Sequence, residues 1–165
     1  AAAGSPLPSF MDMFTGFIPG SIGETSTIAI LIGAALLIFT GIASWKIMVS
    51  TFAGGLLTGL LLNVLATDPS SYMAMPAWNH LVMGGFAFGA VFMATDPVTG
   101  SQTETGKWIY GFLIGMMAIL IRVFNAGYPE GMMLAILLMN TFAPLIDHII
   151  VQSNIKRRLK RAVIK

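Results

Sequence analysis

Residues 92–100, Phe-Met-Ala-Thr-Asp-Pro-Val-Thr-Gly, form a polar stretch between two apolar runs. Asp96 precedes Pro97, and a residue before proline is biased away from helical backbone. The pair therefore predicts a break where one helix ends and another segment begins. Residues 66–69 repeat the tetrapeptide Ala-Thr-Asp-Pro after the preceding apolar run. Two such breaks predict a chain of apolar helices joined by short polar connections.

The composition is that of an integral membrane protein. Hydrophobic residues make up 56% of the 165 residues and charged residues only 10%, unlike a soluble domain. A helix needs about 20 residues to cross a bilayer, so the length allows about five spans. The chain has no cysteine, which excludes disulfides, iron–sulfur ligation and thiol catalysis within it. Its two histidines are far apart and its net charge is only +2, so neither a histidine-rich metal motif nor a nucleic-acid surface is expected.

The apolar runs predict an all-α, polytopic helix bundle. A capping-box spacing, Ser21 followed by Glu24, predicts the start of the first span. The expected spans cover residues 23–42, 47–66, 80–94, 108–124 and 131–151, of which the third is short. Residues 1–22 are expected to form an outer-side loop or interfacial segment, and residues 152–165 a basic cytoplasmic tail. The chain starts at Ala1 with neither methionine nor a charged leader, so a secretory signal is not expected and a fragment is.

Lysine and arginine residues determine the expected orientation. The basic cluster at residues 156–161 is the densest in the chain, so the positive-inside rule places the C-terminus in the cytoplasm. Alternation through the five spans then places Lys46 and Lys107 inside and Arg122 toward the outer side. The break at Asp96 is expected on the cytoplasmic side, and the one at Asp68 on the outer side.

The three middle spans each contain two glycines four residues apart, namely Gly55 and Gly59, Gly85 and Gly89, and Gly111 and Gly115. Small residues at this spacing let helices approach closely in a membrane, so tight packing is the first interpretation. The alternative is that the glycines of the short third span leave room for a flat ring system.

Asp147 is the first candidate for a functional group. It follows a long apolar run and precedes the basic cluster by nine residues, about 14 Å of helix. Pro144 cannot donate a backbone hydrogen bond and so frees the carbonyl of Asn140. Carboxylate, amide and carbonyl oxygens are hard ligands suited to Na⁺. The alternative is an acid at a helix end that bonds His148 or reaches the interface. Asp96 is interpreted as a solvated helix cap or as a second acid of the ion path.

Anion binding is the other chemistry that the residues suggest. Arg122 and Glu130 belong to the outer ends of their spans and are expected to pair; alternatively, the guanidinium faces an anionic group such as a phosphate. A helix that starts after residue 21 would present free backbone amides. A phosphate or flavin edge is then expected beside Ser21, Gly23, Glu24 and Thr25, with pure helix capping as the alternative.

Six stretches together resemble a known family. They are residues 18–26 (Ile-Pro-Gly-Ser-Ile-Gly-Glu-Thr-Ser), 84–89 (Gly-Gly-Phe-Ala-Phe-Gly), 92–98 (Phe-Met-Ala-Thr-Asp-Pro-Val), 128–133 (Tyr-Pro-Glu-Gly-Met-Met), 143–148 (Ala-Pro-Leu-Ile-Asp-His) and 154–159 (Asn-Ile-Lys-Arg-Arg-Leu). The joint pattern resembles the B-type subunit of the sodium-translocating NADH:quinone oxidoreductase and, more weakly, the D subunit of the Rnf complex. It covers nearly the whole chain.

The resemblance implies a bacterial inner-membrane protein of about ten helices in two similar halves, of which this chain resembles the C-terminal one. It implies a six-subunit complex, an enzyme that passes electrons from NADH through flavins to a quinone and pumps Na⁺; this fragment alone is not expected to be active. The family carries FMN esterified to a threonine of a Ser-Gly-Ala-Thr motif and also binds riboflavin. That motif is absent here, so the attachment residue is expected upstream of Ala1.

The resemblance leaves residues 21–25 as a flavin neighbour, and Asp96 and Asp147 as acids of the Na⁺ path. A passive channel or secondary transporter is the alternative from another functional class, because glycine-rich broken helices and an intramembrane acid also suit solute permeation. An Rnf-type subunit that works with ferredoxin and NAD is the second alternative.

Overall fold

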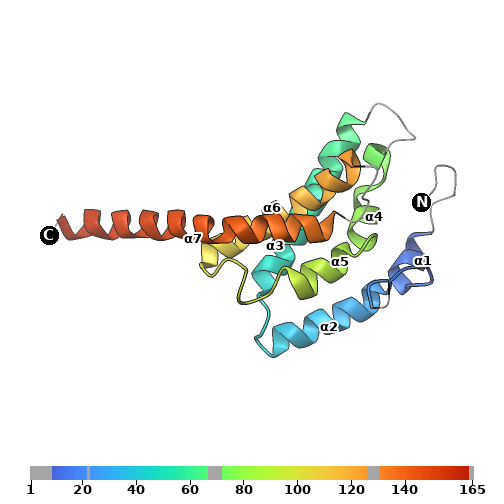
Figure 1. The fold of residues 1–165 in the computed structure, drawn as a ribbon, viewed down its shortest axis with the longest axis horizontal. Coiled ribbons are helices and arrows are strands. Elements are labelled where there is room, and N and C mark those ends of the chain that lie inside the picture. The colour runs from blue at the N-terminus through green and yellow to red at the C-terminus, as the bar shows by residue number, and fades with distance from the viewer. Residues whose placement is uncertain (1–8, 22, 67–71, 126–130, 164–165) are drawn as a thin grey trace.

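The computed structural model describes residues 9–21, 23–66, 72–125 and 131–163. All regular structure within these ranges is helical, which confirms the prediction of an all-α membrane bundle. Figure 1 shows the arrangement. The elements are α1 (Phe10–Thr15), α2 (Thr27–Phe39), α3 (Trp45–Leu65), the 3-10 turn η1 (Tyr72–Ala74), α4 (Ala77–Val82), α5 (Phe86–Phe88), the π-helical turn η2 (Gly89–Met93), α6 (Glu104–Phe124) and α7 (Met132–Val163).

Among the described residues, three helices are long and apolar enough to cross a membrane. They are α3, α6 and the segment Met132–Arg161 of α7, which correspond to the second, fourth and fifth predicted spans. The first predicted span is shorter than expected, because α2 has only 13 residues, and the third is interrupted. Full-length spans thus account for three of the five predicted segments.

The predicted helix start at Ser21 is wrong. α2 begins at Thr27, and its N-cap is Ser26, whose hydroxyl accepts a hydrogen bond from Ala29 N at 3.4 Å. Gly23 has a φ of 90°, which a right-handed helix cannot contain. Glu24 N instead donates to the Ser21 carbonyl at 3.3 Å in a turn.

The third predicted span is divided into α4, α5 and η2. Gly84 and Gly85 separate α4 from α5 and have φ values of 57° and 64°, a left-handed conformation that glycine adopts at little cost. The predicted break at Asp96 and Pro97 is confirmed, because helical structure ends at Met93 and resumes only with α6. The similar break at Asp68 lies outside the described residues.

The largest buried cluster joins α3, α5, α6 and α7. Its fully buried side chains include Phe86, Tyr110, Ile114 and Ile119. The Phe52 and Phe86 rings pack edge to face with centroids 5.7 Å apart, a favourable aromatic geometry. This core holds the interrupted segment against the three long helices.

α3 and α6 pack with their backbones in contact. A Cβ atom on Gly115 of α6 would lie 2.6 Å from the backbone nitrogen of Gly55 in α3, so the predicted tight packing is confirmed for these two helices. The space beside Gly89 is filled by the Met132 side chain of α7. A flat ring beside the glycines of the third span therefore has no free space at Gly89, and for Gly84 and Gly85 this alternative stays a prediction.

We expect Gly115→Ala to lower the free energy of unfolding by about 1–3 kcal/mol, the usual cost of overpacking. The added methyl would collide with the backbone of Thr51 and Gly55, so α3 and α6 would have to separate. Thermal unfolding of the purified full-length subunit measures the effect. Gly33→Ala is the matched control, since its Cβ would meet only the tip of the Phe92 ring, which can rotate away. Equal melting temperatures for the two variants would contradict the packing argument.

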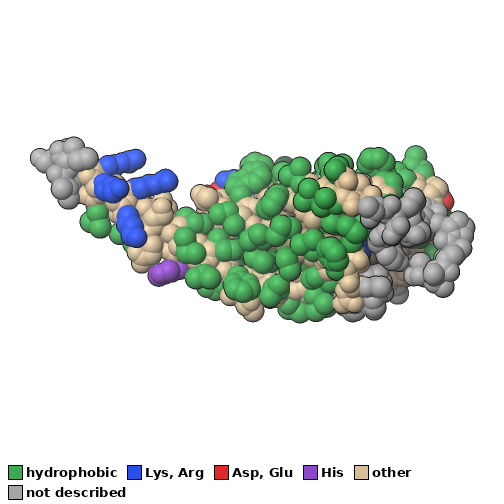
Figure 2. All heavy atoms as spheres, turned by 90° about the horizontal axis from the view of Figure 1, so that it is seen from above, with side chains coloured by type: hydrophobic (Ala, Val, Ile, Leu, Met, Phe, Trp, Pro, Cys, Tyr) green, Lys and Arg blue, Asp and Glu red, His purple; other side chains and the backbone are tan. Residues whose placement is uncertain are grey.

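α7 extends well beyond the bundle. Its 32 residues correspond to about 48 Å of helix, whereas the hydrocarbon core of a bilayer is about 30 Å thick. Residues 151–161 are all exposed, so the predicted basic tail continues α7 as a helix. Figure 1 shows these turns projecting from the bundle, and Figure 2 shows lysine and arginine side chains on the projection and hydrophobic side chains over the body.

Candidate functional site

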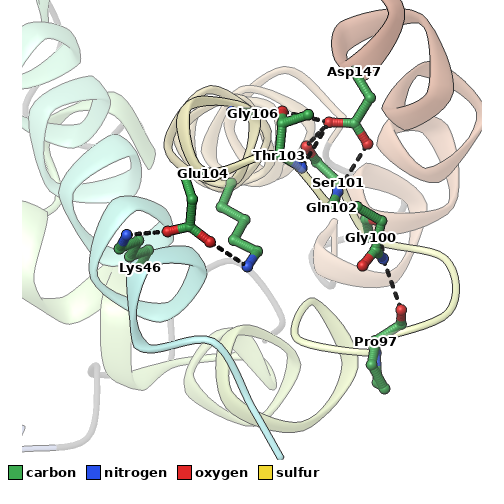
Figure 3. A network of polar contacts seen from close by, with 10 residues as sticks. Lys46, Pro97, Gly100, Ser101, Gln102, Thr103, Glu104, Gly106 and Asp147 are labelled. Carbon is green, nitrogen blue, oxygen red and sulfur yellow. Dashed lines mark hydrogen bonds and ion pairs between the residues drawn. The ribbon is translucent and has the colours of Figure 1, made fainter. Parts of the chain in front are cut away.

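The carboxylate of Asp147 is the centre of a hydrogen-bonded cluster at one end of the bundle (Figure 3). Its Oδ1 atom accepts hydrogen bonds from Ser101 Oγ at 2.6 Å, Thr103 Oγ1 at 2.6 Å and Thr103 N at 3.0 Å. Its Oδ2 atom accepts one from Gln102 N at 2.8 Å. Four donors from residues 101–103 thus attach α7 to the loop before α6, and we call this set the Asp147 clamp.

Local sequence explains why the loop presents these donors. Thr103 is the N-cap of α6, and its hydroxyl accepts a hydrogen bond from Gly106 N at 3.1 Å while donating to Asp147. Gly106 leaves the space that the carboxylate needs, because a Cβ there would lie 2.7 Å from Asp147 Oδ1. The sequence analysis missed Ser101, Gln102, Thr103 and Gly106. The N-cap signal, a threonine before an acidic first turn, could have identified only Thr103.

Asp96 closes the other end of the same loop. Its Oδ2 atom accepts hydrogen bonds from Thr99 Oγ1 at 2.7 Å and Thr99 N at 3.1 Å, and its Oδ1 atom accepts one from Val98 N at 3.4 Å. The Thr99 hydroxyl keeps the pKa of Asp96 below its usual value. Gln102 Nε2 donates to the carbonyls of Pro97 at 2.7 Å and Gly100 at 2.9 Å. Asp96 and Asp147 therefore order one loop from its two ends.

Asn140 lies deeper along α7. Seven residues separate it from Asp147, about 10 Å of helix. Its side-chain oxygen accepts a hydrogen bond from the hydroxyl of the buried Tyr110. Pro144 lies inside α7 and cannot supply the usual hydrogen bond to the Asn140 carbonyl. The structure thus places Asn140 and Asp147 on α7 and Asp96 at the start of the loop before α6, without bringing the three predicted Na⁺-path residues into a single ligand shell.

A polar pocket of about 300 Å³ lies beside the loop. Its wall is formed by residues 41–47, residues 95–97, Ser101, Gln102, Glu104 and Lys107. Glu104 pairs with Lys107 at 2.9 Å and with Lys46. Since Ser101 and Gln102 belong both to this wall and to the Asp147 clamp, they connect the carboxylate to the pocket.

Arg122 is buried toward the opposite end of α6, with 3% of its surface exposed. Its guanidinium donates hydrogen bonds to the carbonyls of His80 at 2.6 Å, Met83 at 2.8 Å and Gly84 at 3.4 Å. These carbonyls belong to the last turn of α4 and to the two residues after it, where a cation is favourable. The predicted partner Glu130 lies outside the described residues.

The predicted anion site at residues 21–25 is arranged differently from expectation. Ser21 and Gly23 are exposed in a turn, and Thr25 packs near Gly20. Glu24 approaches the interrupted segment, since a Cβ on Gly85 would lie 3.1 Å from Glu24 Oε2. The structure therefore brings Glu24 and Arg122 to adjacent residues of the α4–α5 turn.

A family model described as NQR2, RnfD, RnfE matches residues 2–156. The chain belongs to this family. It is 60% identical over 153 residues to the B-type subunit of the Na⁺-translocating NADH-quinone reductase of Chromohalobacter salexigens, a match that covers 93% of this chain and 37% of the relative. The corresponding protein of Klebsiella pneumoniae is 57% identical over 160 residues, with 97% of this chain and 39% of the relative covered. The chain thus spans about two fifths of the length of these relatives.

The two ends of this NQR2/RnfD/RnfE family bundle hold different chemistry. One end has ionised acids, hydroxyls and backbone amides around a polar pocket, and the other has a buried guanidinium against backbone carbonyls. Within the described ranges, no group of three or more histidine, cysteine or acidic side chains is placed to hold a metal ion.

Proposed function

We propose that this chain is part of the membrane domain of a B-type subunit of a Na⁺-translocating NADH:quinone oxidoreductase. The observation that supports the proposal is the 57–60% identity over more than nine tenths of the chain with proteins of that name. The proposal includes the other subunits of a six-subunit complex as partners. It also includes a bacterial inner membrane with the C-terminus of this chain in the cytoplasm, the side that the basic end of α7 favours.

The polar end of the bundle supports a role for Asp147 in Na⁺ movement. Its Oδ2 atom accepts one hydrogen bond, and a carboxylate oxygen can accept more. The hydroxyls of Ser101 and Thr103 can rotate and turn lone pairs toward a cation. Na⁺ at Asp147 would then weaken the contact between α7 and the loop before α6, provided that the ion binds one arrangement better than the other. Asp96 and Asn140 are second candidates along the same path.

Three observations bear on where the proposed complex would hold a flavin. The Ser-Gly-Ala-Thr motif is absent, Met132 occupies the space beside Gly89, and the Arg122 guanidinium donates to carbonyls near the α4–α5 turn. We therefore propose that covalent FMN is attached outside this chain and that riboflavin and quinone belong to the complex. Residues 21–25 and Arg122 remain the proposed flavin neighbours on this chain.

Reconstitution of the intact complex into vesicles tests this function. We expect NADH oxidation by quinone to require Na⁺ and to drive ²²Na⁺ accumulation. An Rnf-type complex would need ferredoxin and NAD instead. A passive channel or secondary transporter would move ²²Na⁺ without NADH. A requirement for ferredoxin and NAD, or ²²Na⁺ movement without NADH, would overturn the proposal.

A further inference from the structure

The end of α7 beyond Asp147 is the largest feature that the proposed function does not use. Among the hydrogen bonds of the described residues, those of the Asp147 clamp are the last along α7 that attach it to the loop before α6. The helix continues from there to Val163, 16 residues or about 24 Å further. Figure 1 shows this part projecting from the bundle, and Figure 2 shows that it bears a group of basic side chains.

The projecting turns are amphipathic although no described element covers them. Val151, Ile155 and Leu159 follow one another at four-residue spacing and so share one stripe of the helix. They are 45%, 43% and 59% exposed. Apolar side chains at this spacing are typical of a helix that binds in a groove.

Beyond the uncharged residues 152–154, the surface of these turns outside the stripe is basic. Lys156, Arg157, Lys160 and Arg161 lie 60° or more from the stripe at about 100° per residue, and Arg158 borders it. Residues 148–165 contain no acidic side chain. This segment therefore presents an apolar stripe flanked by uncompensated positive charge.

We propose that the projecting part of α7 is a docking helix for a partner protein with an acidic surface. An apolar groove in that partner would receive Val151, Ile155 and Leu159, and acidic side chains on its rim would face the basic residues. The partner is a subunit that exposes this surface to the aqueous phase at the polar end of the bundle. In this respect the inference rests on the proposed function, which places the chain in a multi-subunit complex.

The geometry favours a protein over the membrane surface as the partner. A helix that binds at a lipid interface lies in the plane of the membrane. α7 is one continuous helix from Met132 to Val163, and Met132–Arg161 includes the membrane-spanning part. Its end therefore points away from the bilayer, so contact with anionic lipid would require a bend that the structure does not show.

Photo-cross-linking in the purified, intact complex tests the inference. Benzoylphenylalanine replaces Leu159, and a matched control replaces Leu137, a leucine of the same helix with 56% exposure on the membrane-spanning part. We expect the probe at position 159 to cross-link to an acidic segment of another subunit, and the probe at 137 not to reach that segment. Lys156→Glu with Lys160→Glu should lower the yield on the order of tenfold, whereas Lys156→Arg with Lys160→Arg should retain it.

Products confined to lipid would show a membrane-surface helix and overturn the inference. The inference would also be overturned by the absence of a product or by a product within the same polypeptide. A cross-linking yield that stays the same after charge reversal at positions 156 and 160 would overturn it as well. The same samples are assayed for Na⁺-dependent NADH oxidation by quinone. Activity without the cross-link refutes the docking helix alone, and the cross-link without that activity refutes the proposed function alone.

Discussion

Asp147→Ala is expected to raise the Na⁺ concentration needed for half-maximal turnover by about 10–100-fold, the usual effect of losing a group that positions or binds a metal ion. The substitution also removes the acceptor of four hydrogen bonds from residues 101–103. We therefore expect the free energy of unfolding to fall by about 2 kcal/mol, since hydrogen bonds to charged groups contribute about 1.5–3 kcal/mol each and the loop can regain water. NaCl titration of NADH:quinone activity and thermal unfolding of the complex measure the two effects.

Two variants separate the charge of Asp147 from its clamping role. Asp147→Asn keeps the shape but removes the charge, so the Na⁺ requirement should rise as it does for alanine. Ser101→Ala keeps the charge and removes one donor, so we expect a loss of about 1 kcal/mol in stability and a smaller rise in the Na⁺ requirement than for Asp147→Asn. If Ser101→Ala and Asp147→Asn shift the Na⁺ requirement equally, or if Asp147→Ala leaves it unchanged, Asp147 is a structural clamp only.

Arg122→Ala is expected to cost the most stability of any single change considered. The guanidinium satisfies carbonyls of His80, Met83 and Gly84, and a buried polar group left unsatisfied costs about 1–3 kcal/mol. The cavity adds to this cost, so we expect a loss of about 3 kcal/mol or more and a subunit that is poorly retained in the complex. Gel filtration after heating measures the stability of the variant.

Arg122→Lys is the matched control for this position. Lysine keeps the positive charge but lacks the planar fork that reaches several acceptors at once, so we expect an intermediate melting temperature. The opposite outcome is a normal melting temperature for Arg122→Ala with loss of bound flavin. That result would replace the structural role with the anion-binding role that the sequence also allowed.

The long spans were predictable because their signals are local. The helices α3, α6 and α7 have enough length and hydropathy to cross a bilayer, and small residues at four-residue spacing predicted the close contact of α3 with α6. The start of α2 was not predictable from Ser21 and Glu24, because the φ of Gly23 at 90° overrides the capping-box spacing. The interruption of the third span has the same cause at Gly84 and Gly85.

The candidate site was predictable only in part. An acid such as Asp147 after an apolar run can be found without a structure, because its burial is costly and requires a partner. Its partners could not be found, since Ser101 and Thr103 are 46 and 44 residues away in sequence. Serine and threonine in a loop have no pattern that distinguishes a clamp from a solvated turn.

Local signals in the chain were enough to specify the membrane class, the three long helices and the break at Asp96 and Pro97, because hydrophobicity, helix length and proline geometry act within a few residues. The packed bundle was needed to show that the loop after this break hydrogen-bonds to Asp147 on α7 and that Arg122 binds the interrupted third segment. The physical reason is that a polar group in an apolar bundle takes its partner from whichever helix lies beside it, and that neighbour depends on packing between distant segments.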